Sequence, residues 1–219
     1  MFSSLAREAM GDRYRGTMAE QADKSTIRRQ LRDKLEAMND ADRQAKSLAA
    51  TNFLTASPEF AAARVVMLYL TAAFELDTAP LALKCWQTGK TVLVPKVSWD
   101  QRRMLPVEIS SLQTRMTTTG PGVREPVSGQ PMPINLVDLV IVPGIGFSPQ
   151  GHRIGRGMGF YDRFLAQPDF VGLSCGMGFE EQVIPDIPVL DHDMCLSMLC
   201  TDRGIRRFAT NCISPDIRE

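Results

Sequence analysis

Residues 142–162 combine a glycine-rich backbone with positive charge, a combination suited to binding phosphate. The segment holds six of the chain's 16 glycines, together with Arg153 and Arg156. Glycine has no Cβ, so backbone N–H groups can come close to a polyphosphate, and arginine pairs well with phosphate oxygens. A helix predicted to begin near Tyr161 would direct its positive end to the same place. We therefore interpret the segment as a candidate polyphosphate-binding loop.

Other loop types fit this segment less well. A long turn would also use glycines at left-handed positions, but it would not require two arginines and an aromatic pair. A dinucleotide fingerprint needs G-x-G-x-x-G close to the end of a strand, and residues 155–159 (GRGMG) lack that spacing. A Walker A loop would continue into Gly-Lys-Ser/Thr, which does not follow here. The plain turn remains open as the simplest alternative.

A second group of cations lies on the first predicted helix, which begins near Asp23. Lys24, Arg28 and Arg32 recur every four residues and therefore share one helix face. An apolar stripe runs beside them, formed by Ile27, Leu31, Leu35 and Met38. In an isolated helix these cations would be solvated, and an RNA-binding surface is a further alternative. A single stripe without interleaved aromatic residues gives that alternative weak support.

Composition excludes several classes of protein. The 219 residues include 25 Lys+Arg and 25 Asp+Glu, and this zero net charge argues against bulk binding to nucleic acid or to anionic membranes. No apolar run approaches the roughly 20 residues of a membrane helix, and residues 1–20 lack the apolar stretch of a secretory signal. The five cysteines show no C-x-x-C spacing, and with only two histidines a Cys/His zinc cluster has little to build on. We expect a cytoplasmic protein with reduced thiols.

The strands and helices that must position these residues alternate along the chain. Continuous apolar runs predict buried strands at residues 65–70, 91–94, 136–142, 171–179 and 194–199. Helices are expected near residues 78–88 and 161–166, and Pro95 should end the second strand. This alternation predicts an α/β fold, a three-layer sandwich with a largely parallel central sheet and helices on both faces.

The second N-terminal helix and the connecting regions complete the prediction. Asn39-Asp40 should cap that helix, whose apolar stripe would consist of Ala45, Leu48, Ala49 and Phe53. Residues 120–133, rich in glycine and proline, predict an irregular surface loop. We expect a single α/β domain over residues 23–210, a variable N-terminal extension over residues 1–22 and a C-terminal tail over residues 211–219.

Four motifs occur in an order that is typical of one known family. Residues 142–162 are similar to its signature P-G-x-x-F…G-x-R-L-G-[RK]-G-x-G-[YF]-Y-D, and residues 24–28 (KSTIR) resemble its K-x-x-[LI]-R. Residues 75–78 (ELDT) resemble its E-[ILV]-D-T, and residues 191–194 (DHDM) resemble its late acidic motif. Over roughly residues 23–203, the chain therefore resembles the 5-formyltetrahydrofolate cyclo-ligases, also called 5,10-methenyltetrahydrofolate synthetases.

The resemblance implies an enzyme that uses ATP and Mg²⁺ to close 5-formyltetrahydrofolate to 5,10-methenyltetrahydrofolate, through phosphorylation of the formyl oxygen. It implies a set of nucleotide-binding residues: Lys24, Arg28, Arg153, Gly155, Arg156, Gly157, Gly159, Phe160 and Tyr161. Among these it gives Arg153, Arg156 and Tyr161 a part in catalysis. It implies that Glu75, Phe160 and Tyr161 bind the folate, with or without a polyglutamate tail, and that Asp162 and Asp193 ligate magnesium. The protein would act as a monomer, away from membranes and nucleic acid.

Each implied role has a structural alternative. Asp162 and Asp193 could cap a helix and a turn, and Phe160 and Tyr161 could belong to the core. A folate or nucleotide binder without catalytic activity would keep the same scaffold. The chain also departs from the family pattern at Met158, at Phe160, where tyrosine is common, and at Phe74, where smaller or polar residues are frequent.

Overall fold

A central seven-stranded sheet organises the computed structural model, which describes residues 23–119 and 123–209. The predicted extension and tail lie outside these described residues. The order is β11-β10-β9-β6-β1-β2-β3, and β10, β9, β6, β1 and β2 run parallel to one another. The edge strands β3 and β11 are antiparallel to β2 and β10. The strands are β1 (Val65–Met67), β2 (Thr91–Ser98), β3 (Arg103–Glu108), β6 (Leu139–Val142), β9 (Leu173–Met177), β10 (Met198–Thr201) and β11 (Gly204–Arg207).

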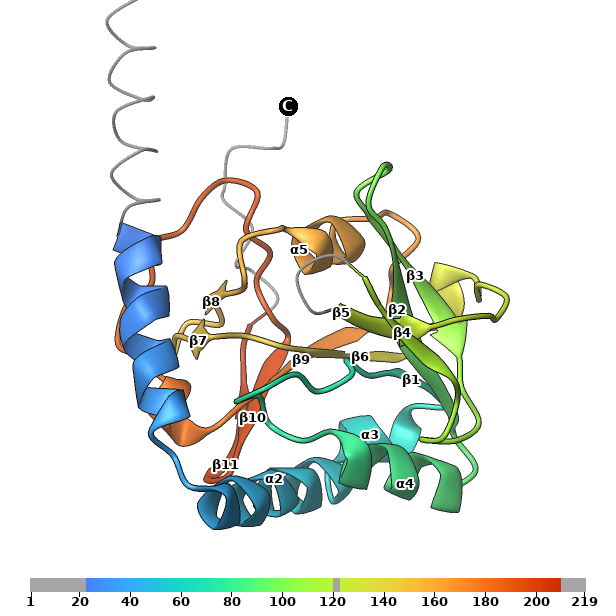
Figure 1. Ribbon diagram of the computed structural model, residues 1–219, viewed down its shortest axis with the longest axis horizontal. Helices are drawn as coiled ribbons and strands as arrows, with labels where there is room; N and C mark the ends of the chain where they lie inside the picture. Colours follow the sequence, from blue (N-terminus) through green and yellow to red (C-terminus); the bar gives the residue numbers. More distant parts are fainter. Residues whose placement is uncertain (1–22, 120–122, 210–219) are drawn as a thin grey trace, which may run out of the picture.

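Helices cover both faces of this sheet, which confirms the predicted three-layer α/β architecture (Figure 1). One face carries α2 (Asp40–Thr55), α3 (Pro58–Ala62) and α4 (Ala79–Gln87), and the other carries α5 (Phe160–Leu165). Strand β6 shows why both faces must be covered, because all four of its residues are buried. Its alternate side chains enter different cores: Leu139 and Ile141 join the α2–α4 side, whereas Val140 and Val142 join the α5 side.

Three further elements border the sheet. The helix that spans residues 23–36 runs beside a two-stranded sheet of β7 (Gly146–Phe147) and β8 (Arg153–Ile154) (Figure 1). A hairpin of β4 (Met116–Thr119) and β5 (Val123–Pro126) lies near β2. The prediction of an irregular loop over residues 120–133 is therefore wrong at β5. Within the described ranges, no helix has both the length and the apolar character of a membrane span.

Helix α2 begins as predicted but buries a different face. The Asn39 side chain caps it by accepting a hydrogen bond from the Asp42 N–H at 2.8 Å. The predicted apolar stripe is wrong, since Leu48 and Phe53 are 51% and 44% exposed. The buried face consists instead of Ser47, Ala50, Thr51 and Leu54. Small and hydroxyl-bearing residues let the helix approach β10 closely, as the 3.3 Å contact between Cys200 Sγ and the Ala50 carbonyl shows.

Strand β2 continues through Pro95 instead of ending there. Pro95 is paired with Pro106 of β3, so neither residue has an N–H to offer the other. On the opposite side, β1 pairs with β2 only as far as Leu93, so Pro95 removes no hydrogen bond from β1. The strand expected at residues 194–199 begins only at Met198, and the edge strands β3 and β11 were not predicted.

Candidate active site

The glycine-rich segment lies at the carboxyl end of β6, the edge where α/β sheets bind ligands. After Val142 the chain forms the small β7–β8 sheet and then enters α5. Gly157 and Gly159 have φ values of +95° and +64°, left-handed conformations that disfavour side chains. Gly159 is the residue before α5, so both left-handed glycines lie in the loop that the sequence predicted to bind phosphate.

The first helix meets this loop directly. Arg28 Nε donates to the Gly155 carbonyl at 2.8 Å, and a Cβ on Gly157 would lie 3.7 Å from Arg28 Nη2. Lys24, only 4% exposed, forms an ion pair with Asp193. Burial lowers the pKa of Arg28 from its usual value, although the charge of Asp193 opposes this effect, and the guanidinium stays cationic. Lys24 and Arg28 of the predicted cationic stripe thus face the interior of the molecule, whereas Arg32 is exposed.

The two predicted metal ligands are connected through the backbone of Met194. Asp162 Oδ1 accepts from Arg153 Nη2 at 2.9 Å and from the Met194 N–H at 3.2 Å, and Met194 directly follows Asp193. Asp193 Oδ2 forms the ion pair with Lys24 and accepts a hydrogen bond from the Leu190 N–H. Each carboxylate therefore keeps one oxygen that has no hydrogen bond within the described ranges. No group of three or more His, Cys, Asp or Glu side chains that could hold a metal occurs among the residues described.

Glu75 faces the loop from the other side. Its Oε1 accepts from Arg156 Nη2 at 2.8 Å, and its Oε2 accepts from the Ala72 N–H at 2.9 Å. Burial raises the pKa of Tyr161 well above its usual range, and the nearby Glu75 carboxylate adds to the effect. The Tyr161 hydroxyl is buried and has no hydrogen-bond partner in the described part of the chain. Tyr161 is therefore a neutral phenol whose O–H is available to donate.

Aromatic side chains and Arg153 complete this region. Phe160 is half-buried and meets Trp99 in an edge-to-face contact, with ring centroids 5.3 Å apart. Arg153, only 7% exposed, lies 5.8 Å from the centre of the Tyr161 ring, and its Nε is buried without a partner among the residues described. Trp99 was not predicted, because it lies at the end of β2 in a stretch without a motif. Every predicted site residue thus lies around one region, between the first helix, the glycine-rich loop and the loop of residues 68–78, called the Glu75 loop below.

Comparison with known proteins identifies the family. A model described as the 5-formyltetrahydrofolate cyclo-ligase family matches residues 20–202, which is most of the chain. The chain belongs to this family. The mouse 5-formyltetrahydrofolate cyclo-ligase is 26% identical over 181 residues, covering 78% of this chain and 89% of the relative. The *Escherichia coli* K12 protein of the same name is 26% identical over 174 residues, with 78% of this chain and 96% of the relative covered.

Solved structures agree with this assignment. The NMR structure of *Aquifex aeolicus* 5,10-methenyltetrahydrofolate synthetase matches with a TM-score of 0.74 and 27% identity, over 90% of this chain and 99% of that one. A 5,10-methenyltetrahydrofolate synthetase from *Mycoplasma pneumoniae* matches with a TM-score of 0.68 over 82% of this chain and 99% of that one, and its 19% identity supports the fold alone. The cyclo-ligase fold is therefore complete over the described core of the chain.

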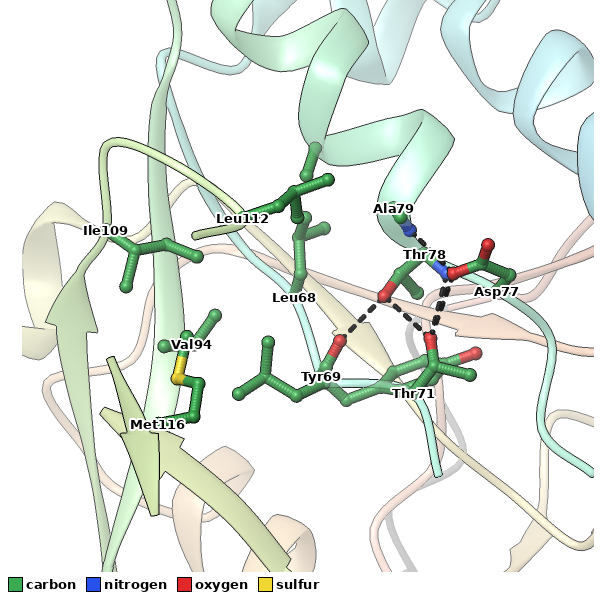
Figure 2. A pocket seen from close by; sticks show the side chains of 12 residues that line it. Leu68, Tyr69, Thr71, Asp77, Thr78, Ala79, Val94, Ile109, Leu112 and Met116 are labelled. Atoms are coloured by element: carbon green, nitrogen blue, oxygen red, sulfur yellow. Dashed lines mark hydrogen bonds between the residues drawn. The ribbon is translucent and has the colours of Figure 1, made fainter. Parts of the chain in front are cut away.

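This cyclo-ligase chain also holds a cavity of about 170 Å³ beside the Glu75 loop, at the carboxyl end of β1 and next to Val94 in the middle of β2. Figure 2 shows Thr71, Asp77 and Thr78 on one side, with their hydrogen bonds to one another, and apolar side chains opposite. The apolar wall includes Leu68, Val94, Ile109, Leu112 and Met116. The cavity is smaller than the roughly 300–1,000 Å³ of typical ligand pockets. No predicted phosphate-binding residue lines it, so it does not replace the site described above.

Proposed function

We propose that this chain catalyses the ATP-dependent cyclisation of 5-formyltetrahydrofolate to 5,10-methenyltetrahydrofolate. The observation that carries the proposal is the meeting of the first helix with the glycine-rich loop, through the 2.8 Å hydrogen bond from Arg28 to Gly155. Family membership supports the same reaction. Lys24, Arg28, Arg153 and Arg156 bring four cations to the carboxyl edge of the sheet, where a triphosphate needs them.

In the proposed reaction, the formyl oxygen attacks the γ-phosphorus of ATP and ADP leaves. N10 of the folate then attacks the formyl carbon and loses its proton. The C–O bond breaks and releases inorganic phosphate, which carries the former formyl oxygen. Phosphorylation is required because an amide oxygen is a poor leaving group. Phosphoryl transfer depends mainly on positioning and charge neutralisation, so the reaction needs no covalent nucleophile from the protein.

Arg156 has the best position for this step. Its backbone belongs to the phosphate-binding loop, and its guanidinium pairs with Glu75 on the opposite side of the site. It therefore lies between the proposed phosphate region and the proposed folate region, where the formyl oxygen must meet the γ-phosphate. With 45% of its side chain exposed, Arg156 can turn toward the charge that develops in the transition state.

Glu75, Phe160 and Tyr161 are the proposed folate-binding residues. The Glu75 carboxylate can accept hydrogen bonds from pterin N–H groups, and the Phe160 ring offers a stacking surface that is already oriented by Trp99. The unpartnered Tyr161 hydroxyl can donate to the substrate or to the transferring phosphate. In this proposal, the Tyr161 hydroxyl and the Phe160 ring bind the substrate in addition to packing against the protein.

Asp162 and Asp193 are the proposed ligands of Mg²⁺. The ion, when bound with the nucleotide, would neutralise charge on the phosphate oxygens. Magnesium in such sites is held by one or two carboxylates, with waters and phosphate oxygens as the remaining ligands. The two aspartates fit that pattern, because each keeps one carboxylate oxygen without a hydrogen bond among the described residues.

The test is incubation with 5-formyltetrahydrofolate and MgATP, following methenyl absorbance and ADP together. The proposal predicts equal amounts of methenyl product and ADP, and loss of both when magnesium is removed. Arg28→Met should reduce the rate strongly, whereas Arg29→Met, a change at the exposed neighbouring arginine, should not. Folded protein that binds ATP and 5-formyltetrahydrofolate but yields no product would be a binder without catalytic activity.

A further inference from the structure

We infer that Arg43, a residue of α2 outside the phosphate and folate contacts, positions Glu75 for substrate binding. Arg43 lies over the ring of Phe74, with its guanidinium carbon 5.4 Å from the ring centre. Phe74 directly precedes Glu75 in the loop that follows β1. The inference rests on the proposed function, because Glu75 is the proposed folate-binding carboxylate.

The backbone at Phe74 requires external support. Its φ of +67° is left-handed, a conformation that costs a bulky residue free energy, and Phe74 is one of two non-glycine residues with positive φ among those described. Phe74 is 40% exposed, so burial in the core does not fix its side chain. Such a conformation persists only where its surroundings impose it, and the Arg43 contact is an interaction on that ring which can do so.

Arg43 is itself held firmly. Its Nη2 donates to the carbonyls of Leu35 and Met38, each at 2.9 Å, where the first helix ends. A cation at the carbonyl end of a helix is favourably placed. The side chain is only 15% exposed, so its guanidinium forms a fixed bridge from the first helix to the ring of Phe74.

Helix α2 holds the loop at a second point as well. The buried Ser47 hydroxyl accepts from the Asp77 N–H at 3.1 Å and donates to the Arg43 carbonyl at 2.7 Å. Glu75 therefore lies between two residues that α2 contacts, Phe74 through Arg43 and Asp77 through Ser47. Its carboxylate is oriented by Ala72 and Arg156, and its backbone N–H donates to the Ala72 carbonyl at 3.2 Å, so the two contacts with α2 add to a turn that the loop forms itself.

The phosphate contacts of Lys24 and Arg28 should be independent of Arg43, whereas Arg156 is linked to Glu75 by its ion pair. Arg28 precedes Leu35 by about 10 Å of helix, and Lys24 and Arg28 have their own partners in Asp193 and Gly155. Loss of the Arg43 contact should therefore weaken folate binding and leave nucleotide binding nearly unchanged. A general loss of structure would affect both.

The test is steady-state kinetics and calorimetric binding on full-length Arg43→Met and Phe74→Gly. We expect both variants to raise KM and Kd for 5-formyltetrahydrofolate about tenfold, while KM for ATP stays within about twofold. Arg43→Lys should recover part of the loss, since it keeps a cation over the ring but lacks the planar fork. Arg64→Met, at an exposed arginine on the amino side of β1, is the matched control and should change neither constant.

Phe74→Gly separates positioning from stability, because glycine relieves the left-handed strain while removing the ring. Its Tm should not fall although KM for the folate rises. Adding Arg43→Met to Phe74→Gly should raise KM for the folate little further. Unchanged folate KM and Kd in both single variants, with a lower Tm in Arg43→Met, would overturn the inference. Wild-type protein that binds 5-formyltetrahydrofolate without making product would refute the proposed reaction, and the Kd comparison would still decide the role of Arg43. Wild-type protein that does not bind it would overturn both.

Discussion

Replacing Arg156 by alanine should damage catalysis far more than stability. The Arg156–Glu75 ion pair is partly exposed, with 45% and 18% of the two side chains accessible, and pairs of this kind contribute about 0.2–1 kcal/mol. For a domain of this size, that loss corresponds to a fall in Tm of no more than about 4 °C. A charge that serves the transition state is worth much more: loss of one such group lowers kcat by about 10²–10³-fold.

The structure supplies a matched control for this experiment. Arg207 and Glu59 form another ion pair, with 52% and 17% of their side chains exposed, at the β11 edge of the sheet. Arg207→Ala should lower Tm as much as Arg156→Ala does but leave kcat unchanged. Both variants would be compared by thermal unfolding and by methenyl absorbance under saturating substrates. If Arg156→Ala lost activity only in proportion to its loss of folded protein, Arg156 would be a structural residue and the proposed role would be wrong.

Further predictions concern pH and thiol reactivity. The hydrogen bond from Arg206 lowers the pKa of Glu180, so the folded carboxyl takes up a proton less readily than the unfolded one and stability should fall as the pH drops below about 4.5. Glu180→Gln should therefore reduce the fall in Tm between about pH 5 and pH 3; an unchanged profile would show that this carboxyl does not contribute. Burial raises the pKa of Cys85 and of Cys200 to about 12, so native protein at about pH 8 should resist iodoacetamide at both thiols while unfolded protein reacts, as mass spectrometry can determine. Rapid alkylation of either thiol in the native state would contradict the burial described here.

Local sequence signals predicted the N-terminal cap of α2 but not which of its faces is buried. Asn39 caps α2 as expected, because capping depends only on a side chain and the next three residues. The buried face of α2 was predicted wrongly, since hydrophobic periodicity favours Leu48 and Phe53, whereas close packing on β10 selects small residues such as Ala50. The prediction that Pro95 ends its strand was also wrong. Whether β2 can contain a proline depends on where the pairing with β1 ends, which the sequence does not show.

The residues of the proposed site are more visible in the sequence than the packing is, for a physical reason. Phosphate chemistry requires particular residue types at short spacing, so Arg153, Arg156 and the glycines between them are visible as a motif. Contacts between distant segments are not visible in this way. Neither the pairing of Glu75 with Arg156 nor the contact of Arg43 with Phe74 has a sequence pattern, and only the folded chain shows them.

The most direct test of the proposed chemistry follows the formyl oxygen. 5-Formyltetrahydrofolate labelled with ¹⁸O at the formyl group would be converted with MgATP, and the released phosphate and water would be examined by mass spectrometry. Phosphorylation of the formyl oxygen predicts one ¹⁸O atom in each inorganic phosphate formed. Recovery of the label in water, with unlabelled phosphate, would show that the ring closes without this activation and would contradict the account.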